Sequence, residues 1–307
     1  MLTPPLTVQA WAHDLEALHT HISRHFHRAE PRRRALAYLQ ALLSPCERKN
    51  GWQLAEQMGD RTPDGVQRLL NAARWDADAV RNDLRTYVAT HLADPSAVLI
   101  IDETSFIKRG TKSVGVQHQY CGTTGELENC QVGVFLAYAS RQGTAFIDRA
   151  LFLPKAWAAS HERRAEAGVP DEVQFATKPH LARAMVDRAF DAGLVVGWVT
   201  ADTLYGCDRR LRHGLEQRYQ RYVLAIKSNE LLPRDAFWSL NAKYVAEDFA
   251  AEDWHRLSAG AGTKGPRWFD WAWRELPYAT GGQDAHGWGQ WLLVRRSVAD
   301  PTDLTYW

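Results

Sequence analysis

The feature that most constrains the fold is a change of hydrophobic period at Asp94-Pro95-Ser96. Before this point, apolar residues recur every three or four positions, which predicts amphipathic helices. After it, residues 97–101 form the continuous aliphatic run AVLII, which is typical of a strand buried on both faces. A helical region followed by a strand-containing region predicts about two domains, with a boundary near residue 94.

The first 94 residues are expected to be helical. One apolar stripe covers residues 8–26, Pro31 opens a second helix, and a further stripe covers residues 80–92. Residues 51–58 and 63–71 predict two short helices joined by a glycine turn, with the dimensions of a helix-turn-helix. The alternative for this pair is a helical hairpin packed as ordinary core.

The middle of the chain, residues 95–227, is predicted to form a mixed sheet with helices on its faces. After the run at 97–101, strands are expected at 115–120, 131–138, 146–153, 194–200 and 222–226. Helices are expected at 179–192 and 208–217. The fold class is therefore α+β.

Residues 228–307 are rich in tryptophan and contain alternating, strand-like segments. The tryptophans are Trp238, Trp254, Trp268, Trp271, Trp273, Trp288, Trp291 and Trp307. We predict a β-rich subdomain whose tryptophans form its core, because a tryptophan side chain buries a large apolar area. Stacking of these rings on DNA ends is the alternative.

Two aspartates, Asp102 and Asp202, directly follow the two most hydrophobic predicted strands. In open sheets, functional side chains gather at the carboxyl ends of strands, so parallel neighbouring strands would bring these two carboxylates together. Converging carboxylates repel each other and need a cation, and Mg²⁺ or Mn²⁺ bound to oxygen ligands can clamp a phosphodiester. The alternative for each aspartate is a turn or helix cap.

Three segments resemble the insertion-sequence transposases of the DDE superfamily, in particular the insertion sequence 701 type. They are IDETSFIKRGTKSVGVQHQYCGTTGELENCQVGVFLAYAS, VQFATKPHLARAM and WVTADTLYG, and KNGWQLAEQMGDRTPDGVQRLLNAARWD is similar to that family too. The resemblance covers nearly the whole chain. It implies a ribonuclease-H-like core, Asp102 and Asp202 as the first and second catalytic, metal-binding carboxylates, two Mg²⁺ or Mn²⁺ ions, and recognition of terminal inverted repeats in double-stranded DNA.

The same resemblance implies a third acid, a glutamate on a helix beyond the β-rich insertion. The sequence ends at Trp307, still inside or just closing that insertion, so we expect the chain to be truncated at the C-terminus and to lack the matching glutamate. Glu230 is the nearest substitute. A transposase derivative that binds DNA without cutting it is therefore the alternative function.

Four further residues are candidates to support the carboxylates or to contact the scissile phosphate. They are Glu103, Lys108, Lys112 and Tyr205. A solvated charge run, or an ion pair between Glu103 and Lys108, is the alternative.

The formal net charge is only +1, so a DNA-binding surface must be a local basic patch. The candidate DNA-binding residues are Arg32, Arg33, Arg34, Gln67, Arg68 and Arg74. A homodimer is a candidate assembly, and we expect no membrane partner because no run reaches about 18 apolar residues. The polar N-terminus and four cysteines without a C-x-x-C pair favour a cytoplasmic protein with reduced thiols, and the transposase resemblance implies association with the nucleoid. No Walker-type phosphate loop is present in the sequence, so ATP use is not indicated.

Overall fold

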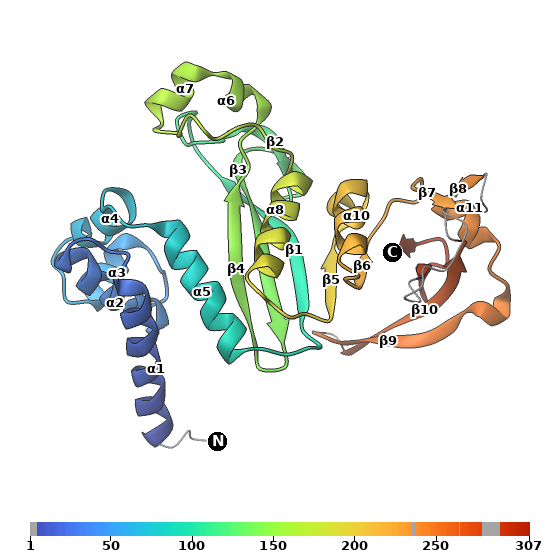
Figure 1. Cartoon of the computed structure of the whole chain (residues 1–307), viewed down its shortest axis with the longest axis horizontal. Coiled ribbons are helices and arrows are strands. Elements are labelled where there is room, and N and C mark those ends of the chain that lie inside the picture. The colour runs from blue at the N-terminus through green and yellow to red at the C-terminus, as the bar shows by residue number, and fades with distance from the viewer. Residues whose placement is uncertain (1–4, 235–237, 264, 278–288) are drawn as a thin grey trace. The chain divides into compact units, whose positions relative to one another are not determined.

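The computed structural model describes the backbone of residues 5–234, 238–263, 265–277 and 289–307, and side chains from residue 9 onward (Figure 1). Trp288, part of a predicted strand, lies outside the described residues. The chain divides into two compact units, Met1–His91 and Leu92–Trp307. No described helix is both long enough and apolar enough to cross a membrane.

The first unit is helical in its described part, as predicted. Its helices are α1 (Pro5–Ser23), α2 (Ala29–Leu43), α3 (Gly51–Gln57), α4 (Asp64–Asn71) and α5 (Ala77–His91). Asn50 caps α3, because its side chain accepts hydrogen bonds from the backbone N–H groups of Trp52 and Gln53. Leu54 and Val66 pack α3 and α4 against α2 in one buried cluster.

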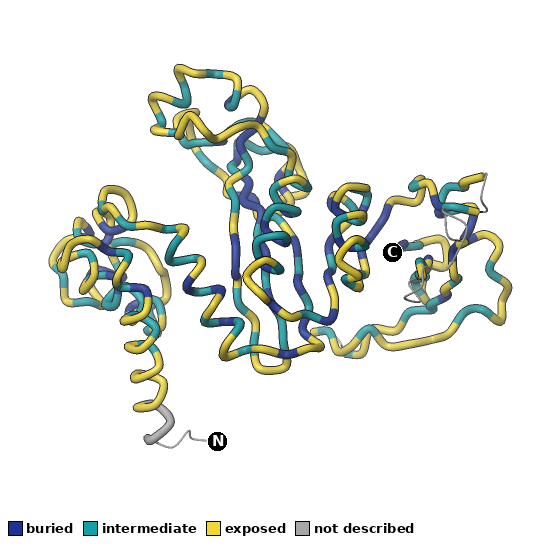
Figure 2. Tube along the Cα trace, in the orientation of Figure 1, coloured by how far each residue is buried: buried dark blue, intermediate teal, exposed yellow. Residues whose placement is uncertain are grey.

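The second unit is built on a mixed sheet. Its described strands are β1 (Val98–Ile107), β2 (Gln117–Cys121), β3 (Glu126–Ser140), β4 (Gly143–Leu151), β5 (Trp198–Ala201) and β6 (Tyr222–Leu224). Strand β3 pairs antiparallel with β1, β2 and β4, whereas β1, β5 and β6 are mutually parallel neighbours. Figure 2 shows buried positions concentrated along these strands. The mixed α+β architecture agrees with the prediction.

The first strand is longer than predicted. It continues past residue 101 to Ile107 because β3 pairs with it along its whole length, from Val98↔Ala139 to Ile107↔Cys130. Leu99 and Ile101 are buried, while Val98 and Ile100 on the opposite face are half-buried. Complete burial of both faces is therefore wrong for this strand.

The strand expected at 194–200 is shorter, and it begins only at Trp198. Leu194 belongs to the C-terminal cap of α8 (Lys178–Asp191), where its N–H donates to the carbonyl of Ala189 and its side chain is buried. An apolar residue that follows a helix often packs back on the helix in this way. That packing explains why the apolar residue Leu194 lies before the strand rather than in it.

Five helices are described between β4 and β6. They are α6 (Lys155–Ala159), α7 (His161–Glu166), α8, α9 (Thr203–Gly206) and α10 (Arg209–Gln217). Helix α8 buries Ala182, Met185, Val186 and Ala189, and it packs against β3 and β4. The helices expected at 179–192 and 208–217 are confirmed.

The C-terminal part of the second unit is β-rich, as predicted. Its described elements are β7 (Leu231–Pro233), β8 (Ser239–Asn241), α11 (Ala242–Glu247), the 3-10 helix η1 (Ala251–Asp253), β9 (His255–Gly262), β10 (Gly265–Leu276), β11 (Gln290–Ser297) and β12 (Leu304–Tyr306). Strands β9 to β12 form one antiparallel sheet in the order β12–β11–β10–β9. Leu292 and Val294 of this sheet share a buried cluster with Val245 of α11.

The prediction that the tryptophans form this core is wrong for most of those described. The exposed ones are Trp238, Trp268, Trp273 and Trp291. Side chains alternate between the faces of a strand, so Trp291 points away from the core that Leu292 and Val294 enter. Trp271 and Trp307 stack on each other at 5.6 Å between ring centroids and are half-buried.

Candidate active site

The site begins where the parallel ladder between β1 and β5 ends. The last paired residues are Ile101 and Ala201, and the next residue on each strand is an aspartate, Asp102 or Asp202. Neighbouring strands lie about 4.8 Å apart, so the two aspartates start side by side at one edge of this ladder. The condition set by the sequence argument, that the two strands are parallel neighbours, is met.

Asp102 does not end its strand, which corrects the sequence-based placement. It lies inside β1, opposite Phe135 of β3, and only β5 stops at this level. Its Oδ1 accepts a hydrogen bond of 2.8 Å from the backbone N–H of Glu103, and the residue is exposed. The carboxylate is therefore open to a ligand from solvent.

Asp202 is the N-cap of α9. Its Oδ1 accepts a hydrogen bond of 2.9 Å from the backbone N–H of Leu204, so the helix-cap role weighed from the sequence is also present. This bond fixes the carboxyl group at the end of β5. The residue is exposed, which leaves the second carboxylate oxygen accessible.

The two carboxylates lie in a region of concentrated negative charge. Partial burial raises the pKa of Asp202, and the nearby carboxylates of Glu103 and Asp102 raise it further. Backbone hydrogen bonds from Leu204 and Tyr205 oppose this shift without cancelling it. A bound cation would offset the repulsion that these acids exert on each other.

Glu103 lies on the other face of β1 and is held by two side chains. Lys178, at the start of α8, places its Nζ 2.9 Å from Oε1 of Glu103, and both side chains are 17% exposed. The hydroxyl of Tyr205 donates to Oε2 of Glu103. Burial, followed by this hydrogen bond to Glu103, raises the pKa of Tyr205, so the phenol stays protonated.

Comparison with known proteins identifies the family of this chain. The family model described as "DDE superfamily endonuclease" matches residues 21–240 of the 307. The chain belongs to this family. The α+β architecture and its mixed sheet are consistent with a DDE nuclease fold.

A relative supports the more specific resemblance to the insertion sequence 701 type. The "Probable transposase for insertion sequence element IS701" of Microchaete diplosiphon is 29% identical over 206 residues. The alignment covers 65% of this chain and 51% of the relative, so the chain spans about half the length of that transposase. The insertion sequence 701 resemblance is thereby confirmed.

The donor set of this DDE-superfamily chain fits a hard divalent cation. Mg²⁺ is commonly held by one or two carboxylates and keeps several waters, and Asp102 and Asp202 supply two carboxylates with free oxygens. Within the described ranges, no group of three or more His, Cys, Asp or Glu side chains is arranged to hold a metal ion. Asp102 and Asp202 are therefore two carboxylate donors of a kind that fits a divalent cation.

The lysines predicted beside the carboxylates lie elsewhere. Because β1 continues to Ile107, Lys108 lies six positions beyond Asp102, a path of about 20 Å along an extended strand. Lys112 forms an ion pair with Glu166 of α7. The structure instead provides Lys178, which the sequence reasoning missed because the only signal was its place after the Thr177 cap of α8.

Glu230, the nearest substitute acid, is occupied by another partner. Its Oε1 lies 2.8 Å from a guanidinium nitrogen of Arg212, and both side chains are largely buried. This ion pair joins α10 to the start of β7. Glu230 therefore has a structural interaction of its own.

The candidate DNA-binding residues of the first unit divide into two groups. Arg34, Arg68 and Arg74 line one cavity, together with Arg28. The residues that do not line it are Arg32, Arg33 and Gln67, all of which are exposed.

Proposed function

We propose that this chain acts as a DNA transposase, cutting at transposon ends and joining them to target DNA in a divalent-metal-dependent reaction. The observation that carries the proposal is the adjacent placement of Asp102 and Asp202 at the end of the β1–β5 ladder. The family match and the named transposase relative support the reaction class. A derivative that only binds DNA is not favoured, because the matched residues 21–240 include both carboxylates.

The sheet supports a ribonuclease-H-like core for residues 95–227. An antiparallel set of strands, β1, β3 and β4, is followed by two strands parallel to β1. This order brings acids that are far apart in the sequence to one edge. We assign residues 1–94 to DNA binding and residues 228–307 to a β-rich insertion.

The proposed partner is double-stranded DNA carrying terminal inverted repeats, with a homodimer as the candidate assembly. Arg32, Arg33, Arg34, Gln67, Arg68 and Arg74 are the proposed DNA contacts, through phosphates above all. Lys108 and Lys112 would contact the DNA backbone away from the cut, since they lie far along β1 and its loop.

In the proposed reaction, water attacks a phosphodiester and releases a 3′-hydroxyl, which then attacks a phosphodiester of the target. Mg²⁺ or Mn²⁺ bound here would stabilise the negative charge that develops on the phosphate oxygens. Asp102 and Asp202 would hold the cation and orient the phosphate. Tyr205 and Lys178 would hold the side chain of Glu103 in place. Because Tyr205 belongs to α9, its hydrogen bond to Glu103 would also fix the position of the helix that Asp202 caps.

The test measures metal binding and cleavage by the same variants. We expect Asp102→Asn and Asp202→Asn each to weaken Mn²⁺ binding, followed by electron paramagnetic resonance, and to slow nicking of a labelled transposon-end duplex by at least about 100-fold. Asp171→Asn, in an exposed loop of the same unit, is the matched control and should change neither. Mn²⁺ binding that is equally tight in all three variants would refute the assignment.

A further inference from the structure

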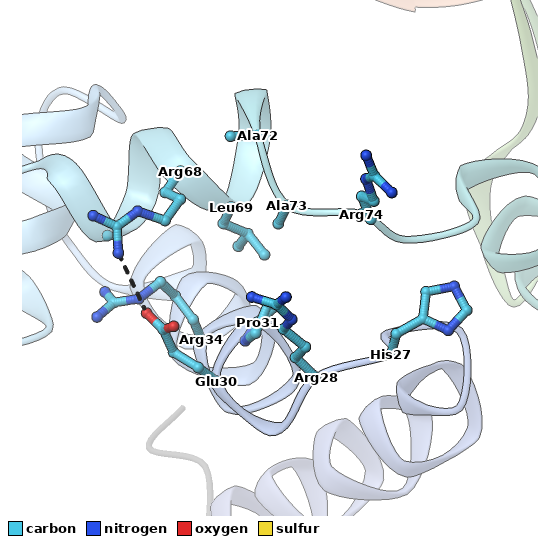
Figure 3. Close-up of a pocket in the computed structure, with 11 residues that line it drawn as sticks. His27, Arg28, Glu30, Pro31, Arg34, Arg68, Leu69, Ala72, Ala73 and Arg74 are labelled. Atoms are coloured by element: carbon cyan, nitrogen blue, oxygen red, sulfur yellow. Dashed lines mark ion pairs between the residues drawn. The ribbon is translucent and has the colours of Figure 1, made fainter.

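The first unit contains a cavity of about 460 Å³ between the start of α2 and the end of α4 (Figure 3). Four arginines line it: Arg28, Arg34, Arg68 and Arg74. Figure 3 shows Arg34 and Arg68 near Glu30 at one side, and His27 and Arg74 at the other. The residues come from segments more than 30 positions apart, so folding creates this concentration of charge.

The positive charge exceeds the negative charge around this cavity. Arg68 lies 4.0 Å from Glu30, and Arg34 forms an ion pair with Asp60. The four guanidinium groups thus face two carboxylates, which leaves an excess of two positive charges. An anion that enters the cavity would balance this excess.

The unbalanced groups are Arg28 and Arg74. Within the described part of the chain, neither side chain makes a hydrogen bond or ion pair with another residue, and both are exposed. In addition, the Nε of Arg34 is buried and has no hydrogen-bond partner among the described residues. Buried donors are nearly always satisfied in folded proteins, so an unsatisfied one beside a cavity indicates a missing acceptor.

The backbone at the start of α2 adds partial positive charge beside the cavity. Arg28 is the N-cap of α2, a helix of 15 residues, and its side chain makes no capping hydrogen bond. The first amide groups of a helix carry partial positive charge and bind anions when no side chain caps them. The uncapped start of α2 therefore lies among the arginines that line the cavity.

We infer that this cavity binds a phosphate group. Guanidinium groups offer planar pairs of donors that match phosphate oxygens, and several of them around one concave site favour a phosphate oxyanion. The inference rests on the proposed function for its preferred source, a backbone phosphate of double-stranded DNA. A free phosphate is the other source of the same chemistry.

The test compares two double variants that lose the same charge. Arg28→Gln with Arg74→Gln removes the two unpaired arginines of the cavity, whereas Arg48→Gln with Arg61→Gln removes two exposed arginines that neither line it nor belong to the proposed DNA contacts. With the full chain and a random-sequence duplex, we expect the cavity variant to bind at least about tenfold more weakly than the control variant. Its slope of log affinity against log salt should fall by about one, as for one lost phosphate contact.

Inorganic phosphate distinguishes the two sources. If calorimetry shows phosphate binding to the parent chain and not to the cavity variant, while both bind the duplex equally, the cavity takes a free phosphate. Equal behaviour of the two double variants toward both probes, with unchanged circular dichroism, would overturn the inference. A parent chain that binds no duplex but binds inorganic phosphate through Arg28 and Arg74 would refute the DNA part of the proposed function alone.

Discussion

Lys178 and Glu103 form an ion pair of 2.9 Å that joins the start of α8 to β1, next to the strand position of Asp102. Each side chain is 17% exposed, so solvent screens the pair only partly. Removing one partner from such a pair leaves a poorly solvated charge, and that costs more than the pair itself contributes.

We therefore predict that Glu103→Gln lowers the free energy of unfolding by about 1–3 kcal/mol, because Lys178 loses its counter-charge. Arg183→Gln, in the same helix, removes a 3.6 Å pair with Asp187 whose side chains are 41% and 36% exposed, and it should cost about 0.5 kcal/mol or less. Urea denaturation of both variants measures the difference. Equal losses in the free energy of unfolding would show that the Glu103–Lys178 pair stabilises the fold no more than an exposed pair does.

Asp202→Asn should behave in the opposite way. The raised pKa of Asp202 means that the folded chain disfavours its charged form, and asparagine keeps the α9 cap without the charge. We expect the metal-free variant to be as stable as the parent, or more stable by about 0.5 kcal/mol, since the exposed carboxyl is screened by solvent. Asp208→Asn, at the α10 N-cap, is the matched control and should lose a few tenths of a kcal/mol, about the size of a helix-dipole interaction.

Adding Mg²⁺ completes that measurement. The melting temperature of the parent and of Asp208→Asn should rise, because a ligand that binds only the folded state stabilises it. The melting temperature of Asp202→Asn should not change. A rise of the same size in all three chains would mean that Mg²⁺ binds elsewhere.

Asp83 gives the first unit a dependence on acid pH. Burial would raise the pKa of this carboxyl, but hydrogen bonds from Arg24 at 2.6 Å and His25 at 2.7 Å outweigh it and lower the pKa. Because the folded pKa lies below the unfolded one, the interaction stabilises the folded state above about pH 4, and this contribution is lost as the pH falls through the folded pKa.

We predict that Asp83→Asn speeds hydrogen exchange of α1 and α5 peptides at neutral pH, by about the tenfold or more that corresponds to at least 1.4 kcal/mol. The difference from the parent should shrink as the pH falls below about 4. Asp14→Asn, an exposed acid on α1, removes the same charge and should leave exchange unchanged. A difference that persists undiminished in acid would contradict the lowered pKa.

Adjacent residues of β11 test which face of the C-terminal sheet is the core. Leu292 is 1% exposed and Trp291 is 54% exposed. Leu292→Ala should cost about 2–5 kcal/mol, as for other buried leucines, whereas Trp291→Ala should cost about 1 kcal/mol or less. Thermal unfolding of the two variants measures both losses of stability. A larger loss for Trp291→Ala than for Leu292→Ala would support the tryptophan core predicted from the sequence.

The sequence by itself determined the local structure and the place of the two acids. Helical periodicity, caps such as Asn50 and aliphatic runs act within a few residues, so the helices of residues 5–91 and the strands before Asp102 and Asp202 could be predicted. The tertiary structure decided what depends on distant segments. Pairing with β3 extended β1 to Ile107, the packing of α8 brought Lys178 to Glu103, and the α2–α4 contact gathered Arg28 with Arg74. The tertiary structure also determined which face of the C-terminal sheet is buried. Alternation along a strand defines two faces, but it does not say which of them packs against another element.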